Sequence, residues 1–139
     1  MDDRFQLQRF VEAQRPVYET VLSELRTGRK RTHWMWFIFP QIAGLGRSPT
    51  ARAFAVSSRA EAAAYLAHPT LGPRLRECSV LVSSIEGRSV DEIFDYPDDL
   101  KFHSSMTLFA QAAPEETIFA ACLQKYFGGQ HDPGTLARL

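Results

Sequence analysis

The stretch Arg31-Thr32-His33-Trp34-Met35-Trp36-Phe37-Ile38-Phe39-Pro40-Gln41 holds both tryptophans of the chain. An aromatic surface of this size must be buried in a core or must line a pocket. Residues 34–39 are apolar at every position, and so short a run does not distinguish a buried helix from a buried strand. Because the rest of the chain offers no second strand to pair with, we expect a short buried helix or an extended core segment.

Before this stretch, apolar residues recur at helical spacing from Leu7 to Leu25. Pro16 interrupts the pattern, because proline lacks a backbone donor and clashes with the carbonyl four residues earlier. The sequence therefore predicts two helices, or one kinked helix, that end near Arg26, with Gly28 as the stop. After the stretch, Ser48-Pro49 predicts the start of another helix.

The remaining elements are also predicted to be helical. Ser58 and Ser89 each begin a capping box, and the apolar positions of 71–85 fall on one helix face. Further helices are predicted over about 98–111, with a face formed by Phe102, Met106 and Phe109, from Pro114 to Gly128, and after Asp132-Pro133. The sequence thus predicts an all-α fold, a single compact domain over residues 1–139 with about six to eight helices.

The composition is that of an ordinary globular domain. Lys plus Arg equals Asp plus Glu, at 16 each, so no overall charge draws the chain to nucleic acid or membrane. No membrane-spanning segment or signal peptide is visible. Cys78 and Cys122 lie in apolar patterns and are expected to be buried free thiols in a reducing cytoplasm. Neither cysteine has ligands at metal-binding spacing, so we expect no metal, and we expect no cofactor. We also expect the protein to be a cytoplasmic monomer.

Five segments together resemble an uncharacterised family of bacteria and fungi, whose members are sometimes labelled calpastatin in genome records. The segments are His33-Trp34-Met35-Trp36-Phe37-Ile38-Phe39-Pro40-Gln41, Gly44-Leu45-Gly46-Arg47-Ser48, Tyr65-Leu66-Ala67-His68-Pro69, Asp98-Asp99-Leu100-Lys101 and Ser104-Ser105-Met106-Thr107-Leu108-Phe109. The resemblance implies an all-helical fold and no known activity. A calpastatin is a long, mostly disordered chain, so the label does not suit this aromatic-rich sequence with capped helices.

This chain departs from the family at one place. Phe94-Asp95-Tyr96 stands where the resemblance implies a Phe-Gly pair. We therefore expect a different turn before the helix that carries Lys101.

The turn Gly44-Leu45-Gly46-Arg47-Ser48 is a candidate anion site, because it opens onto a predicted helix start. Backbone donors there, with Arg47, suit a phosphate or a carboxylate. The alternative is a tight turn with an ordinary serine cap. The spacing fits neither a Walker loop nor a dinucleotide fingerprint.

His33 and the tryptophans are candidates for ligand contact. A histidine between Arg31 and Trp34 suits acid–base chemistry or a hydrogen bond to a ligand, or it is a core histidine bonded to a carbonyl. Trp34 and Trp36 suit stacking on a base or sugar ring, although at least one of them is expected in the core. The preceding cations, Arg26, Arg29, Lys30 and Arg31, form either a solvated helix end or an electropositive rim.

Asp98, Lys101 and Ser105 share one face of a predicted helix. Lys101 and Ser105 suit a Ser–Lys pair, but binding of an anion by Lys101, Ser104 and Ser105 demands less of the site. The alternative is a salt bridge from Lys101 to Asp98, with the serines on the helix surface.

We therefore favour a site for a small anionic, phosphorylated or nucleotide-like ligand where 31–41, 44–48 and 98–105 meet. Its candidate ligand-binding residues are Arg31, His33, Trp34, Trp36, Gln41, Gly46, Arg47, Ser48, Lys101, Ser104 and Ser105. A hydrolase or glycosidase-like reaction stays open, with His33, Asp98 and Lys101 as the catalytic candidates. The alternatives are nucleic-acid binding, which zero net charge disfavours, and a protein-interaction module without a pocket.

Overall fold

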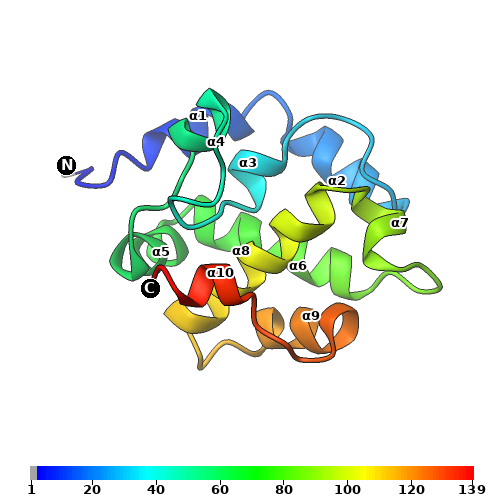
Figure 1. Cartoon of the computed structure of the whole chain (residues 1–139). Helices are drawn as coiled ribbons and strands as arrows, with labels where there is room; N and C mark the ends of the chain where they lie inside the picture. The colour runs from blue at the N-terminus through cyan, green and yellow to red at the C-terminus, as the bar shows by residue number, and fades with distance from the viewer. Residues whose placement is uncertain (1–2) are drawn as a thin grey trace.

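A computed structural model describes residues 3–139 of the chain (Figure 1). Its helices are α1 (Gln8–Gln14), α2 (Tyr18–Arg26), α3 (Met35–Ile38), α4 (Pro49–Ala53), α5 (Arg59–Ala67), α6 (Leu71–Ser83), α7 (Val90–Phe94), α8 (Asp98–Ala112), α9 (Thr117–Phe127) and α10 (Pro133–Leu136). The described part has no strand, and its one β-bridge joins Ile42 to Val56.

The all-α prediction is confirmed, but the predicted number of helices is too low. The described residues form ten helices rather than six to eight. Four of them, α3, α4, α7 and α10, have only four or five residues each. The caps Ser48, Ser89 and Asp132 mark where α4, α7 and α10 begin, but helices of one turn show no apolar period of their own, so the count was too low.

Most helix ends lie where local sequence signals predicted them, but the helix predicted from Pro114 begins at Thr117. Pro16 separates α1 from α2, and Gly28 follows α2 with a φ of 81°. The Ser58 hydroxyl accepts a hydrogen bond from the Glu61 amide at 3.1 Å, and the Ser89 capping box is complete. Gly128 ends α9 in the left-handed conformation that glycine adopts without strain.

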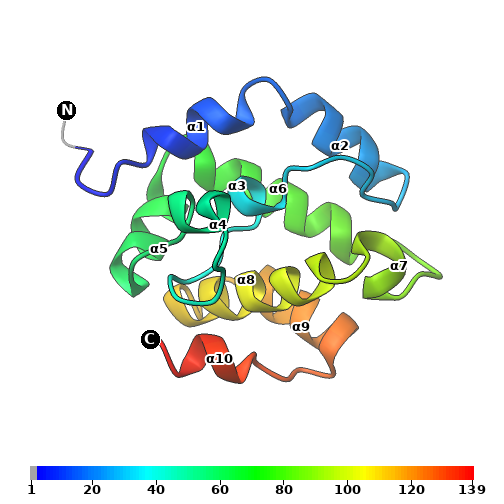
Figure 2. The ribbon, with the colours of Figure 1, turned by 45° about the horizontal axis from the view of Figure 1, so that its top comes forward.

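Helix α8 is the central element of the molecule. It packs against α5, α7, α9 and α10, and Figure 2 shows it crossing the middle of the fold. Phe102, Met106 and Phe109 are buried, as predicted. The polar face predicted through Ser105 does not reach the surface there, because every residue of α8 from Ser104 to Ala110 is buried.

The aromatic stretch packs onto α8, partly as a short helix. The ring of Phe39 meets that of Phe102 edge to face at 5.0 Å, and it meets Phe94 of α7 in the same way. Trp34 and Phe39 are both fully buried. The stretch also packs on α1, and its Trp34 indole donates to Glu24 of α2, so it joins α7 and α8 to the N-terminal helices.

Two further sequence expectations concern the thiols and the membrane. Cys78 and Cys122 are free and buried, and burial raises the pKa of each thiol to about 12. Both are therefore protonated and weakly reactive at neutral pH. Within residues 3–139 no helix has the length and apolar character needed to cross a membrane.

Candidate functional site

The loop between α2 and α3 is fixed by a buried carboxylate, Glu24. One carboxylate oxygen of Glu24 accepts hydrogen bonds from the Arg31 amide at 2.7 Å, the Thr32 amide at 3.1 Å and the Trp34 indole at 2.9 Å. The other accepts from the Thr32 hydroxyl at 2.7 Å. Burial raises the pKa of Glu24, but these bonds outweigh burial and hold the pKa below its usual range.

The two tryptophans have different surroundings. Trp34 is fully buried, with its indole nitrogen bonded to Glu24, so it is a core residue. Trp36 is half-buried, because two residues along a helix turn place a side chain on a different side. It lines a pocket of about 310 Å³ with Arg31, His33 and Tyr96, which we call the aromatic pocket. Its other lining residues are Lys30, Phe94, Asp95, Pro97 and Asp98.

Asp98 lies between two lysines at one side of the aromatic pocket. Its carboxylate oxygens are 2.8 Å from the Lys30 ammonium and 3.3 Å from the Lys101 ammonium. Lys30 also lies 5.2 Å from the centre of the Trp34 ring, and Lys101 lies 5.0 Å from that of Trp36. Lys101 thus forms the salt bridge to Asp98 that was the alternative to a Ser–Lys pair. Two of the catalytic candidates, Asp98 and Lys101, are therefore paired with each other.

The turn at 44–48 does not join the aromatic pocket, so the expected meeting of three segments is not present. A Cβ at Gly46 would lie 2.4 Å from the Ala51 Cβ, so this glycine lets the turn pack closely on α4. The Ser48 hydroxyl caps α4 by accepting from the Ala51 amide at 3.1 Å. Arg47 is exposed, and Gln41 lies beside the same turn. In the structure this turn is therefore a tight turn with an ordinary serine cap, which was the alternative to an anion site.

The two serines of α8 also lie away from the pocket. The Ser104 hydroxyl is 3.1 Å from the Asp132 carboxylate, which caps α10. Ser105 is 0% exposed, and its hydroxyl oxygen has no hydrogen-bond partner among the described residues. A ligand in the aromatic pocket therefore has Arg31, His33 and Trp36 available from the predicted set, but neither serine.

A second pocket adjoins the first and is strongly basic. It has a volume of about 450 Å³ and is lined by Arg29, Lys30, Arg31, Arg88 and Asp95; we call it the basic pocket. Three of its cations belong to the rim that the sequence indicated as an alternative to a solvated helix end. Arg88 comes from the loop between α6 and α7, far along the chain.

Sequence reasoning missed Glu24, Arg88 and Tyr96. Only Glu24 carries a signal in the sequence, because a carboxylate near the C-terminal end of a helix opposes the helix dipole and so calls for another partner. Arg88 and Tyr96 reach the site through tertiary packing, which no local pattern reveals. Within residues 3–139, no group of three His, Cys, Asp or Glu side chains is placed to hold a metal ion.

Comparisons with known proteins agree with this fold. The model of a family described as "Protein of unknown function (DUF1810)" matches residues 4–139. The chain is 58% identical to the conserved hypothetical protein Rv1873 from Mycobacterium tuberculosis, whose crystal structure it matches with a TM-score of 0.97. The match covers 99% of this chain and 98% of that one. The search of curated proteins found no match.

Proposed function

The chain belongs to the DUF1810 family, whose function is unknown, and we propose that it binds a small anionic ligand that carries a flat ring. One observation carries the proposal: a cation, a histidine and two aromatic side chains line one pocket. They are Arg31, His33, Trp36 and Tyr96, around about 310 Å³. This volume is near the lower end for small-molecule sites, which suits a ligand of nucleotide or sugar-phosphate size.

The charges of the pocket favour an anion. Lys30 and Lys101 share the single carboxylate of Asp98, which leaves one positive charge between them, and Asp95 is paired with Arg29. Arg31 is exposed and forms no ion pair with any residue from 3 to 139. A guanidinium offers a planar pair of donors that matches a phosphate or carboxylate. Arg31 is therefore the residue proposed to hold the anionic group.

The aromatic side chains favour a ring in the same ligand. Tyr96 is 77% exposed, so most of its ring is free to contact a ligand in the pocket. Trp36 carries Lys101 over one face of its ring, at 5.0 Å. The proposal places the ligand ring against the remaining aromatic surface of Trp36 and Tyr96, where stacking is worth about 1–3 kcal/mol per base.

The arrangement supports binding more strongly than catalysis. Asp98 and Lys101, two of the three catalytic candidates, are paired with each other. His33 is exposed and lines the pocket. A hydrolase or glycosidase-like step at this site would therefore rest on His33 as the acid or base.

The test is calorimetric titration with adenosine monophosphate, ribose 5-phosphate and inorganic phosphate. We expect adenosine monophosphate to bind best, and we expect Trp36→Ala and Arg31→Ala each to weaken its binding by about tenfold or more. Arg52→Ala, at an exposed position on α4, is the control and should bind like the wild type. Equal binding by all four proteins, or none by the wild type, would overturn the proposal.

A further inference from the structure

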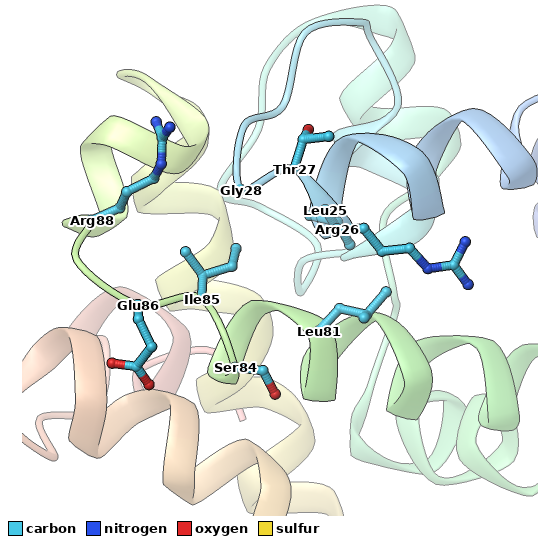
Figure 3. Close-up of a pocket in the computed structure, with 9 residues that line it drawn as sticks. All are labelled: Leu25, Arg26, Thr27, Gly28, Leu81, Ser84, Ile85, Glu86 and Arg88. Carbon is cyan, nitrogen blue, oxygen red and sulfur yellow. The ribbon is translucent and has the colours of Figure 1, made fainter.

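The aromatic pocket is the first of three adjoining pockets, which we call together the groove. It shares Lys30, Arg31 and Asp95 with the basic pocket. The basic pocket in turn shares Arg88 with a third pocket, of about 350 Å³, between the end of α2 and the end of α6 (Figure 3). We call the third one the α2–α6 pocket. The three pockets together follow the loop from Gly28 to Trp36.

Arg88 is held beside this loop although it comes from another part of the chain. Gly28 has a φ of 81°, and a Cβ on it would lie 3.3 Å from the Arg88 Nε. The stem of Arg88 therefore packs against the backbone of the loop that carries Arg31. Figure 3 shows Arg26 and Arg88 on opposite sides of the α2–α6 pocket, with Ile85 between them and Leu81 beneath Arg26, whose guanidinium points away from Arg88.

The acids that line the groove are compensated, but several of its cations are not. The paired acids are Glu86 with Lys125 at 3.5 Å, Asp95 with Arg29 at 2.7 Å, and Asp98 with Lys30 at 2.8 Å. Arg26, Arg31 and Arg88 form no ion pair within the described part of the chain. The groove therefore has a surplus of positive charge that extends away from Trp36.

The distribution of rings and charges distinguishes between classes of ligand. A groove for single-stranded nucleic acid needs aromatic side chains along its length, because successive bases stack on successive rings. Here Trp36 and Tyr96 lie in one pocket at the end of the series, whereas cations line all three pockets. Such a groove fits a ligand with one ring system and a row of linked phosphates.

We infer that the groove binds a nucleoside polyphosphate, with the base in the aromatic pocket, the first phosphate at Arg31 and the terminal phosphates at Arg88. The inference rests on the proposed function, which places the ring of the ligand in the aromatic pocket. It adds that the phosphates extend into the basic pocket. Arg88 is exposed, and its side chain forms no hydrogen bond within residues 3–139, so Arg88→Ala should keep the fold.

The experiment is a calorimetric comparison of adenosine mono-, di- and triphosphate, inorganic triphosphate and a short oligothymidylate, in buffer without divalent cations. We expect the triphosphate nucleotide to bind about tenfold or more tightly than the monophosphate. Arg88→Ala should remove most of this gain and leave monophosphate binding within about twofold, since the change lies outside the aromatic pocket. The control, Arg52→Ala, should leave both affinities unchanged.

The outcomes separate the inference from the proposed function. Equal affinities for the three nucleotides, unaffected by Arg88→Ala, overturn the inference and leave the proposed function standing. Binding of inorganic triphosphate without binding of any nucleotide overturns both, because the base then has no site. Oligothymidylate that binds more tightly than the triphosphate nucleotide overturns the inference in favour of a nucleic-acid strand.

Discussion

At the scale of single residues, the Glu24 carboxylate has more direct partners in the loop than any other group described at the site. It is 7% exposed and accepts from two amides, a hydroxyl and an indole. Glu24→Gln removes the charge and turns an amide NH₂ toward groups that also donate. We expect a loss of about 2–3 kcal/mol in the free energy of unfolding, measured in urea.

The control for this prediction is Glu19→Gln. Glu19 is on the same helix but exposed, so its substitution should change stability by about 0.5 kcal/mol or less. A Glu24→Gln protein as stable as the Glu19→Gln protein would show that the hydrogen bonds to Glu24 do not fix the loop.

Asp95 is strained at the position where the family resemblance implies glycine. Its φ of 63° and ψ of 157° belong to a region that is essentially restricted to glycine, and a side chain there costs about 1–3 kcal/mol. Its ion pair with Arg29 is largely exposed and offsets only about 0–1 kcal/mol. Asp95→Gly should therefore stabilise the protein by about 1 kcal/mol in chemical unfolding.

Asp91→Gly is the matched control for Asp95→Gly. Asp91 lies in the first turn of α7, where glycine is unfavourable, so this variant should lose about 1 kcal/mol. Losses of similar size in both variants would contradict the assignment of strain to Asp95.

At the scale of the element, α8 contains two adjacent serines with opposite energetic roles. Ser104 is bonded to the Asp132 carboxylate, whereas the buried Ser105 hydroxyl has no partner in the described structure. We expect Ser104→Ala to lose about 1–2 kcal/mol of unfolding free energy. Ser105→Ala should be neutral or should gain up to about 1 kcal/mol, because it removes an unsatisfied hydroxyl and adds a better helix former.

Thermal unfolding of the two variants beside the wild type measures the difference. A large loss in Ser105→Ala would mean that its hydroxyl has a bonding partner after all. Neither substitution should change ligand affinity, since neither serine lines the aromatic pocket.

The elements also show what a sequence alone can predict. The ends at Gly28, Ser58, Ser89 and Gly128 were predictable, because a cap depends on residues within one turn of itself. The burial of Ser104 and Ser105 on α8 was not predictable. The residues around a helical serine are the same whether or not a neighbouring helix covers it.

At the scale of the whole molecule, the sequence gives the total charge but not where folding places the charged side chains. The formal net charge is +0, which correctly shows no overall bias but says nothing of its distribution. Folding brings Arg88 beside Arg29 and Arg31 and creates a basic pocket. The sequence could predict a site near His33 and Trp36, because the aromatic and basic residues are adjacent in the chain. It could not predict the part of the site that Arg88 completes.

Acid should destabilise the molecule through carboxylates whose pKa is lowered on folding. A hydrogen bond from Arg76 lowers the pKa of Glu116. For Asp132 and Glu24, burial raises the pKa, but hydrogen bonds to each carboxylate outweigh it. A lowered folded pKa contributes stability above the unfolded value, 4.5 for glutamate and 3.8 for aspartate, and this stability is lost as pH falls below it.

We therefore expect the free energy of unfolding to be nearly constant from pH 7 to about pH 5 and to fall steadily below about pH 4.5. Urea titrations at a series of pH values measure this profile. Glu24→Gln should show a shallower fall than the wild type, because it lacks one of the contributing carboxylates. A Glu24→Gln profile parallel to that of the wild type would show that Glu24 has the same pKa in both states.

The anchoring of the 29–34 loop by Glu24 also affects the timescale and entropy of recognition. The Arg31 and Thr32 amides belong to exposed residues, yet both donate to a carboxylate inside the fold. Their protons should exchange with solvent only when that anchor opens, and so far more slowly than those of an unanchored loop. The groove wall is then ordered before any ligand arrives, and association loses little conformational entropy from the protein.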